Sequence, residues 1–235
     1  MKEIKNFDNY KFRASAVGNL MVGIKSGRTK PGNLSKTTQT YLEKLFIEEI
    51  FGKKKEIHTK QMDKGIFVEE KSITLYSEVT GRLFFKNEKR YENDYTTGTP
   101  DMVKDMVPDI KSSWDIYTFP MFDEKLKNDL YYWQDLTYQW ITGIHQGEIA
   151  YCLVDTPEHI ILDEIRRYMW NNNILDISDE QEREIRNNLT FSNIPKELRV
   201  KRFAVEWNES DIELLKIQII TSRVYLNNLL KEIKL

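Results

Sequence analysis

The sequence has few of the side chains that bind soft metal ions, with one cysteine and three histidines among 235 residues. The single cysteine, Cys152, excludes a disulfide framework, a cysteine zinc site and a cysteine-ligated iron–sulfur cluster. Three scattered histidines argue against a histidine metal centre. We therefore expect any bound metal to have oxygen ligands, which favours magnesium, manganese or calcium.

Long apolar segments are also missing from the chain. No run of about eighteen apolar residues occurs, and the N-terminal MKEIKNFDNYKF lacks the apolar core of a signal peptide. We therefore expect no membrane contact and a cytoplasmic location. The hydrophobic content of 40% excludes general disorder, and the length allows one large domain or two small ones.

Acidic residues are absent between Asp8 and Glu43, although the net charge of the whole chain is −2. That interval contains the loop-like sequence GIKSGRTKPGNLSK and the cations Lys11, Arg13, Lys25, Arg28, Lys30 and Lys36. A solvated basic loop and a loop that contacts anions are both consistent with this pattern. A P-loop is excluded because no Gly-Lys-Ser/Thr triplet closes the run.

The periodicity of the sequence predicts alternating helices and strands. Helices are expected at 13–24, 37–51, 63–79, 123–143 and 177–188, with another after the strand at 148–156. Further β-like segments are expected within 82–113 and at 197–207. Ser210 and Glu213 predict a capping box that starts a C-terminal helix of about twenty residues. No repeat or low-complexity linker divides the chain, so we expect one α/β domain over residues 1–235.

Residues 98–114, GTPDMVKDMVPDIKSSW, predict a β-hairpin that carries three charges on one face. If 104–106 form the loop, Asp101 faces Asp109 across the ladder, with Cβ atoms about 5 Å apart. Lys111 then points to the same side as Asp109, while Ile110 points into the core. Two carboxylates this close resist joint ionisation unless a cation lies between them. A metal site and a solvated polar hairpin face are the two interpretations.

A stripe of apolar residues on the helix at 63–79 contains one carboxylate, and its members are Met62, Ile66, Glu69, Ile73 and Tyr76. Glu69 is therefore expected to point inward, whereas Glu70, about 100° round the helix, is expected to be a surface charge. A carboxylate buried without a partner is strongly unfavourable. The partner of Glu69 would be either a metal held by Asp101 and Asp109 or a basic side chain across the core.

These residues together resemble the PD-(D/E)XK nuclease pattern, with Glu69 on a helix, then Pro100-Asp101, then Asp109-Ile110-Lys111. Downstream, Gln134 and Tyr138 match the Gln-x-x-x-Tyr motif of nucleases related to the nuclease domain of RecB. More narrowly, ASAVGNLM, KGIFVEEKSI and TGTPDMV resemble, in order and spacing, the phage lambda exonuclease family, also called YqaJ-like viral recombinases. The resemblance covers about residues 13–143. Asp109 stands where that family often has glutamate, which shortens the ligand arm.

The resemblance implies a restriction-endonuclease-like α/β core, in which a central mixed β-sheet is flanked by helices, with N-terminal helices, a C-terminal helix and the catalytic part at about 60–143. It implies phosphodiester hydrolysis with Mg²⁺, for which Mn²⁺ would substitute. Lys111 would hold the attacking water and stabilise negative charge on phosphoryl oxygens. Gln134 and Tyr138, four residues apart on one helix face, would brace the carboxylates or touch DNA, although ordinary packing explains the same spacing. The implied metal ligands are Glu69, Asp101, Asp109 and the backbone carbonyl of Ile110.

The activity implied by the resemblance is 5′-to-3′ digestion of one strand of linear double-stranded DNA for recombination, in the cytoplasm of a bacterial host if the chain is phage-encoded. The implied partners are double-stranded DNA ends, a single-strand annealing protein and further copies of the chain in a ring-shaped homotrimer. An endonuclease on the same core is one alternative. A non-catalytic DNA-binding recombination accessory protein is another, but a binding module has no need of converging carboxylates that repel phosphate.

The basic N-terminal segment is the candidate for contact with DNA. The resemblance aligns Ser15 with the family's terminal-phosphate serine, whereas Asp8 stands where that family has an arginine. Arg13 or Arg28 would then grip the phosphate through a guanidinium group. The residues expected to contact DNA are therefore Arg13, Ser15, Lys25, Arg28 and Lys30.

Overall fold

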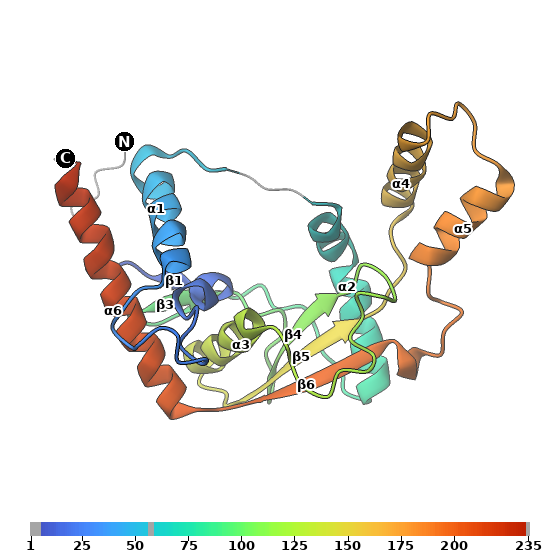
Figure 1. Cartoon of the computed structure of the whole chain (residues 1–235). Coiled ribbons are helices and arrows are strands. Elements are labelled where there is room, and N and C mark those ends of the chain that lie inside the picture. The colour runs from blue at the N-terminus through green and yellow to red at the C-terminus, as the bar shows by residue number, and fades with distance from the viewer. Residues whose placement is uncertain (1–5, 56–58, 234–235) are drawn as a thin grey trace.

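The computed structural model describes residues 6–55 and 59–233. Its elements in chain order are β1 (Phe12–Arg13), the 3₁₀ helix η1 (Ala14–Leu20), α1 (Lys36–Phe51), α2 (Lys60–Thr80), β2 (Tyr91–Glu92), β3 (Thr96–Gly98), β4 (Val107–Ser112), α3 (Asp129–Thr142), β5 (Gln146–Cys152), α4 (Glu158–Asn171), α5 (Asp179–Leu189), the 3₁₀ helix η2 (Lys196–Leu198), β6 (Val200–Glu206) and α6 (Glu209–Glu232). The expected fold class, mixed α/β with flanking helices and a C-terminal helix, is confirmed (Figure 1). The assignment of one domain to residues 1–235 stays a prediction.

The strands of the described residues form two mixed sheets. In the longer sheet, β5 lies between β4, to which it is parallel, and β6, to which it is antiparallel. In the shorter sheet, β3 lies between β1, in parallel, and β2, in antiparallel orientation. Within the part of the chain that the structure describes, β4 is thus an edge strand, and one side of its backbone is open to other groups.

Helices α2 and α3 cover opposite faces of the longer sheet. Ile110 of β4 packs in the hydrophobic cluster that α2 covers. Val107 of β4 packs instead against Tyr138 of α3. Because side chains alternate along a strand, Asp109 and Lys111 share the face of Val107 and point toward α3. The predicted inward orientation of Ile110 is therefore confirmed.

The N-terminal elements pack around α3 and the C-terminal helix. A hydrophobic cluster joins residues of η1, α1, α3 and α6, and Figure 1 shows α6 (red) running beside α1, with α4 and α5 (orange) at the opposite end of the molecule. Gly18 lets η1 approach α3 closely, because a Cβ at this position would lie 2.8 Å from Leu130 Cα. This contact fixes η1, and with it Ser15, next to the helix that bears Gln134.

The predicted hairpin at 98–114 is wrong. Strand β3 ends at Gly98 in the shorter sheet, whereas β4 begins at Val107 in the longer one. The segment between them holds no strand, since Pro100 lacks the backbone donor of a ladder and Met102 turns inward to full burial. The β-like stretch 82–113 contains only the strands β2, β3 and β4.

Two further expectations are corrected at the chain's two ends. The helix predicted at 13–24 is a short strand followed by η1, and Gly23, with φ of 85°, adopts a conformation that an α-helix cannot contain. The Ser210 capping box is absent, because Asn208 caps α6 by accepting a hydrogen bond from the backbone N–H of Asp211 at 3.1 Å. Among the helices of the described residues, none is both long and apolar enough to cross a lipid bilayer.

Candidate active site

An aspartate and a lysine on β4 form the centre of the candidate site. Asp109 is 1% exposed, and its Oδ2 lies 2.6 Å from Lys111 Nζ. Burial lowers the pKa of Lys111, but the Asp109 carboxylate outweighs it, and the pKa ends above its ordinary value. Lys111 is therefore a protonated cation held against the buried carboxylate. Its position on the same face as Asp109 is the one that the alternation of side chains along β4 predicts.

Asp101 reaches the same place from the loop that follows β3. Its Oδ2 accepts a hydrogen bond from the backbone N–H of Ile110 at 2.8 Å. The N–H and C=O of one strand residue point to the same side of the strand. Because the Ile110 N–H points to Asp101, the Ile110 carbonyl also faces the open edge of β4. The two carboxylates thus converge by a loop-to-strand contact and not by the cross-strand pairing that the sequence predicts.

The two aspartates disturb each other's ionisation. Burial raises the pKa of Asp101 to about 8, and the negative charge of Asp109 contributes in the same direction. The Ile110 N–H and the Lys111 ammonium oppose this shift without cancelling it. At neutral pH the Asp101 carboxyl therefore holds a proton unless a further cation approaches it.

Two side chains of α3 hold this charged pair in place. Gln134 Nε2 donates to Asp109 Oδ1 and to the Tyr138 hydroxyl, both at 3.2 Å, and Gln134 Oε1 accepts from Lys111 Nζ at 3.2 Å. Burial, reinforced by Asp109, raises the pKa of Tyr138, so this residue remains a neutral phenol. Gln134 thus fixes both charges of the pair, which ordinary packing of the helix would not require.

Glu69 approaches the site from α2 and is paired with a lysine that sequence reasoning missed. Its side chain is 26% exposed and forms an ion pair with Lys86. Glu70, the next residue, is exposed. The basic partner that the sequence left open as one explanation for Glu69 is therefore present, and it comes from the segment between α2 and β2.

The apolar stripe of α2 is buried only in its C-terminal half, which corrects the expectation from periodicity. Ile73 and Tyr76 are buried, but Met62 and Ile66 are 53% and 70% exposed. Met62 and Ile66 line the same pocket as Glu69. The N-terminal half of α2 therefore borders an open space, and helical periodicity alone does not separate a core face from a cleft wall.

A pocket of about 640 Å³ collects these groups. All four predicted metal ligands line it, together with Lys111, Gln134 and Ser15. Tyr138 lies behind Gln134 at 5% exposure. The structure thus brings together, from η1, α2, the loop after β3, β4 and α3, the residues that the sequence names as the catalytic set.

Among the described residues predicted to contact DNA, Ser15 alone lines this pocket. Arg13 lines two other pockets. Lys25 Nζ lies 3.0 Å from the centroid of the Tyr132 ring, and Arg28 donates from Nε to Ser26 on an exposed turn. Lys30 is also exposed. None of these four cations lines the pocket, so their contact with DNA stays a prediction.

Sequence reasoning missed two residues of α3 that bear on the site. Tyr131 lines the pocket, and Lys111 Nζ lies 4.4 Å from the centroid of its ring. Its position three residues before Gln134, on the same helix face, was a signal that could have identified it. Asp135 is fully buried, burial raises its pKa well above the ordinary value, and Gln139 Nε2 donates to its Oδ2 at 2.9 Å. No pattern in the sequence distinguishes Asp135 from a surface aspartate.

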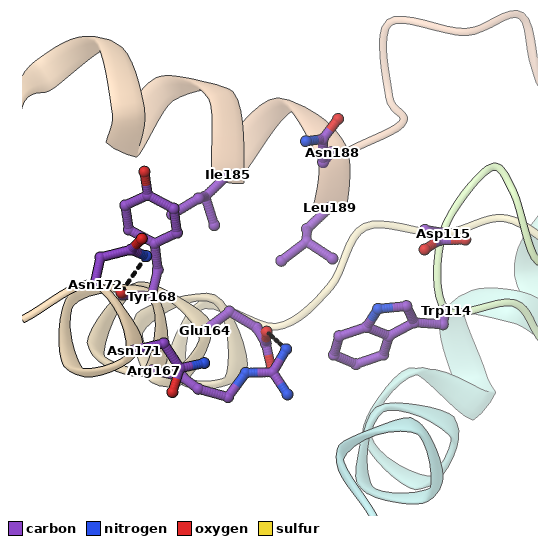
Figure 2. A pocket seen from close by; sticks show the side chains of 10 residues that line it. All are labelled: Trp114, Asp115, Glu164, Arg167, Tyr168, Asn171, Asn172, Ile185, Asn188 and Leu189. Carbon is purple, nitrogen blue, oxygen red and sulfur yellow. Dashed lines mark hydrogen bonds and ion pairs between the residues drawn. The ribbon is translucent and has the colours of Figure 1, made fainter.

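A second pocket, of about 260 Å³, lies between α4, α5 and the segment that leaves β4 (Figure 2). Figure 2 shows the rings of Trp114 and Tyr168 at this cavity, with the apolar side chain of Leu189 near them. Its charged pair, Glu164 and Arg167, has a separation of 2.6 Å and lies three residues apart on one helix. The chemistry of the catalytic set is therefore not repeated there.

The residues of the catalytic pocket fit a hard divalent cation, although the described residues contain no preformed group of three or more histidine, cysteine or acidic side chains that would hold one. Carboxylate and carbonyl oxygens are the ligands such ions prefer. Burial and the neighbouring Asp109 carboxylate raise the pKa of Asp101, and a cation bound beside it would favour the charged form of this carboxyl. Lys111 is paired with Asp109, and Lys86 is paired with Glu69. A bound cation would therefore displace these lysines or share the carboxylates with them.

Comparison with known proteins gives matches among solved structures. No family model and no curated protein matches the chain. A phage-related exonuclease from Haemophilus somnus 129PT superposes with a TM-score of 0.77 at 24% identity, covering 96% of this chain and 97% of its own. The alkaline exonuclease LHK-Exo from Laribacter hongkongensis gives 0.64 at 15% identity, covering 97% and 93%. LHK-Exo in complex with dAMP gives 0.65 at 15% identity, covering 95% and 91%. The chain shares the fold of these exonucleases, and the predicted resemblance is confirmed at that level.

Proposed function

We propose that the chain is a divalent-cation-dependent deoxyribonuclease of the phage recombination type. The observation that carries the proposal is the convergence of Asp101, Asp109, Lys111 and Gln134 on the open edge of β4, in one pocket with Glu69. Such a pocket combines oxygen ligands for a cation with a fixed ammonium group. The fold shared with two exonucleases over nearly the whole chain supports the same conclusion.

In this proposal the chain's own residues prepare a water molecule for attack on a phosphodiester. A Mg²⁺ or Mn²⁺ ion held by Asp101, Asp109, the Ile110 carbonyl and Glu69 would polarise the phosphate and stabilise charge on the leaving oxygen. The Lys111 ammonium orients the attacking water and stabilises negative charge on the phosphoryl oxygens. Gln134 keeps Lys111 and Asp109 at their positions through its two hydrogen-bonding ends. The water oxygen bonds to phosphorus, the bond to the leaving oxygen breaks, and solvent takes and returns the protons.

The finer proposal is that the enzyme digests one strand of linear duplex DNA in the 5′-to-3′ direction. Ser15, the only predicted DNA contact among the described residues that lines the pocket, supports it because a hydroxyl there can donate to a terminal 5′-phosphate. LHK-Exo has been crystallised with dAMP, and a mononucleotide is the product expected of such digestion. By the same resemblance, we propose that the chain forms a homotrimer and works with a single-strand annealing protein.

A gel assay with end-labelled DNA tests the proposal. Linear duplex labelled at the 5′ or 3′ end and covalently closed circular duplex are incubated with the protein, with Mg²⁺ or with EDTA. A 5′-to-3′ exonuclease releases the 5′ label at once as mononucleotide, shortens the 3′-labelled strand progressively, and spares the circle. Cutting of the circle would show the endonuclease alternative. Binding of linear DNA without any hydrolysis in Mg²⁺ or Mn²⁺ would show the accessory protein instead.

A further inference from the structure

A basic groove lies apart from the catalytic pocket and is centred on Arg13. Two adjoining pockets, of about 410 and 370 Å³, share Arg13, Leu45 and Glu48 in their walls. We refer to them together as the Arg13 groove. Their cations come from β1 and the residue before it, from α1, from the segment after α1 and from the segment before β2, and they are Lys11, Arg13, Lys44, Lys53, Lys54, Lys55 and Arg90.

Most of these cations are not neutralised by the protein. Within the described residues, no ion pair involves Arg13, Lys44 or the three lysines at 53–55, whereas Lys11 at the groove wall is paired with Glu92 at 2.7 Å. The acidic residues of the groove are Glu48 and Glu49, and the Tyr10 hydroxyl donates to Glu49 at 3.2 Å. An unpaired positive surface of this density contrasts with the net charge of −2 of the whole chain.

Two chain segments lead from the Arg13 groove to the catalytic pocket. Arg13 lines the groove, and Ser15, two residues on, lines the pocket. Thr97, the register partner of Arg13 in the shorter sheet, lines the groove, and Asp101, four residues on, lines the pocket. At about 3.3–3.6 Å per extended residue, both routes are at most about 14 Å long. On a strand with an axial rise of about 3.4 Å per nucleotide, this corresponds to a few nucleotides.

We propose that the Arg13 groove binds the phosphate backbone of duplex DNA a few nucleotides from the end that occupies the catalytic pocket. The inference rests on the proposed nuclease function and names a second contact for its substrate. Unpaired lysine and arginine side chains bind phosphates by releasing counterions, without regard to sequence. Single-strand grooves add exposed aromatic platforms for stacking, but the two tyrosines of this groove, Tyr10 and Tyr41, are half-buried. Duplex DNA is therefore the better fit.

The first test measures binding of the full-length chain to a fluorescent 20-base-pair duplex by anisotropy in EDTA, over a series of salt concentrations. The groove variant replaces Lys53, Lys54 and Lys55 with alanine. The control variant replaces three exposed lysines outside the groove, Lys125, Lys196 and Lys231, and loses the same charge. The groove variant should lose at least about tenfold in affinity, and its log K against log salt slope should fall by up to about 0.9 per lost phosphate contact. In the control variant, the duplex affinity and the salt slope should each change by no more than a small fraction of the change expected for the groove variant.

A second measurement separates failure of the groove from failure of the proposed function. The p-nitrophenyl ester of thymidine 5′-monophosphate is a small phosphodiester that reaches the catalytic pocket alone. The groove variant should hydrolyse it at the wild-type rate while losing activity on long duplex DNA in proportion to its lost affinity. If the wild-type protein and the groove variant both fail to hydrolyse every substrate, the nuclease proposal fails. If the groove variant still loses duplex affinity in that case, the proposal that the Arg13 groove binds duplex DNA is retained.

Three results would overturn the groove proposal itself. Equal losses of duplex affinity in the groove and control variants would show only a general charge effect. A larger loss of affinity for a single strand of the same length than for duplex would contradict the choice of ligand. An unchanged duplex affinity together with an altered oligomeric state by light scattering would identify the groove as a contact between copies of the chain.

Discussion

The catalytic pocket and the pocket between α4 and α5 contain similar side chains but differ in how deeply the cation is buried. In the α4–α5 pocket, Glu164 is 12% exposed and pairs with Lys60 of α2 and with Arg167 of its own helix, whose side chains are 32% and 62% exposed. In the catalytic pocket, Lys111 and Asp109 pair within one strand, are 19% and 1% exposed, and are both hydrogen-bonded to Gln134 of α3. A pair of the first kind is screened by water and contributes little. Burial of both charged partners, and not the number of charges, therefore distinguishes a candidate reaction centre.

The largest effect expected from this contrast concerns Asp109. Asp109→Asn should abolish hydrolysis, because it removes the buried charge that holds Lys111 and would hold the cation, while DNA binding in EDTA remains measurable. Arg167→Ala in the other pocket should leave the rate unchanged. Release of nucleotides from linear duplex in Mg²⁺ checks both variants. Undiminished cutting by the Asp109→Asn protein, or by the wild-type protein in excess EDTA, would refute the site assignment.

The second expected effect separates two adjacent glutamates of α2. Glu69→Gln should reduce the rate by at least about a hundredfold, as loss of a metal ligand or its support does. Glu70→Gln should be nearly silent, because Glu70 is exposed and does not line the catalytic pocket. Initial rates at saturating Mg²⁺ give the comparison, and circular dichroism confirms that both variants fold. If Glu70 proves to be the essential residue, the role assigned to Glu69 is wrong.

A smaller effect is expected at the end of the DNA. We expect 5′-phosphorylated duplex to be digested faster than 5′-hydroxyl duplex, and Ser15→Ala to reduce this preference more than it slows hydrolysis of the p-nitrophenyl ester. Arg28→Ala tests the predicted arginine contact in the same way, and Arg28 lies on an exposed turn that does not line the pocket. A larger loss of preference in Arg28→Ala than in Ser15→Ala would identify the arginine as the main phosphate contact. Equal rates on both ends with the wild-type protein would contradict a terminal-phosphate site altogether.

The smallest expected effect is a dependence of thermal stability on pH and metal. The pKa of Asp101 is about 8 in the folded state, above its value near 3.9 in the unfolded state. At pH values between these two, the folded state therefore binds a proton that the unfolded state has lost. The contribution of Asp101 to stability is therefore present at low pH and is lost as pH rises through about 8. In EDTA, Asp101→Asn should gain in melting temperature relative to the wild-type protein as pH rises from 5 to 8, by a few degrees. Mg²⁺ should stabilise the wild-type protein more at pH 8 than at pH 5. A metal response that is the same at both pH values would contradict the coupling.

The sequence predicts the members of the catalytic set better than the way in which they meet. Asp101, Asp109 and Lys111 lie together as expected, yet Asp101 arrives from a loop, because hydrogen bonding to the Ile110 N–H replaces the cross-strand pair. Alternation along β4 is local and was predictable, whereas the pairing of β4 with β5 in place of β3 is decided by packing between distant segments. The basic partner of Glu69 depends in the same way on the path of the chain after α2, which no periodic pattern encodes.

The approach of β5 to α3 has a consequence for how this chain tolerates sequence change. A Cβ at Gly147 would lie 1.8 Å from Asp135 Oδ2 and 2.4 Å from Gln139 Nε2. Both side chains are fully buried, and Gln139 also donates to the Val205 carbonyl at 2.8 Å, so neither can move aside freely. In a saturation library every substitution of Gly147 should be depleted, although the residue does not line the catalytic pocket. Recovered alleles should carry a second change, to a smaller residue at Asp135. Such a pair of mutations, found together, would show that β5 and α3 are in contact at these two positions.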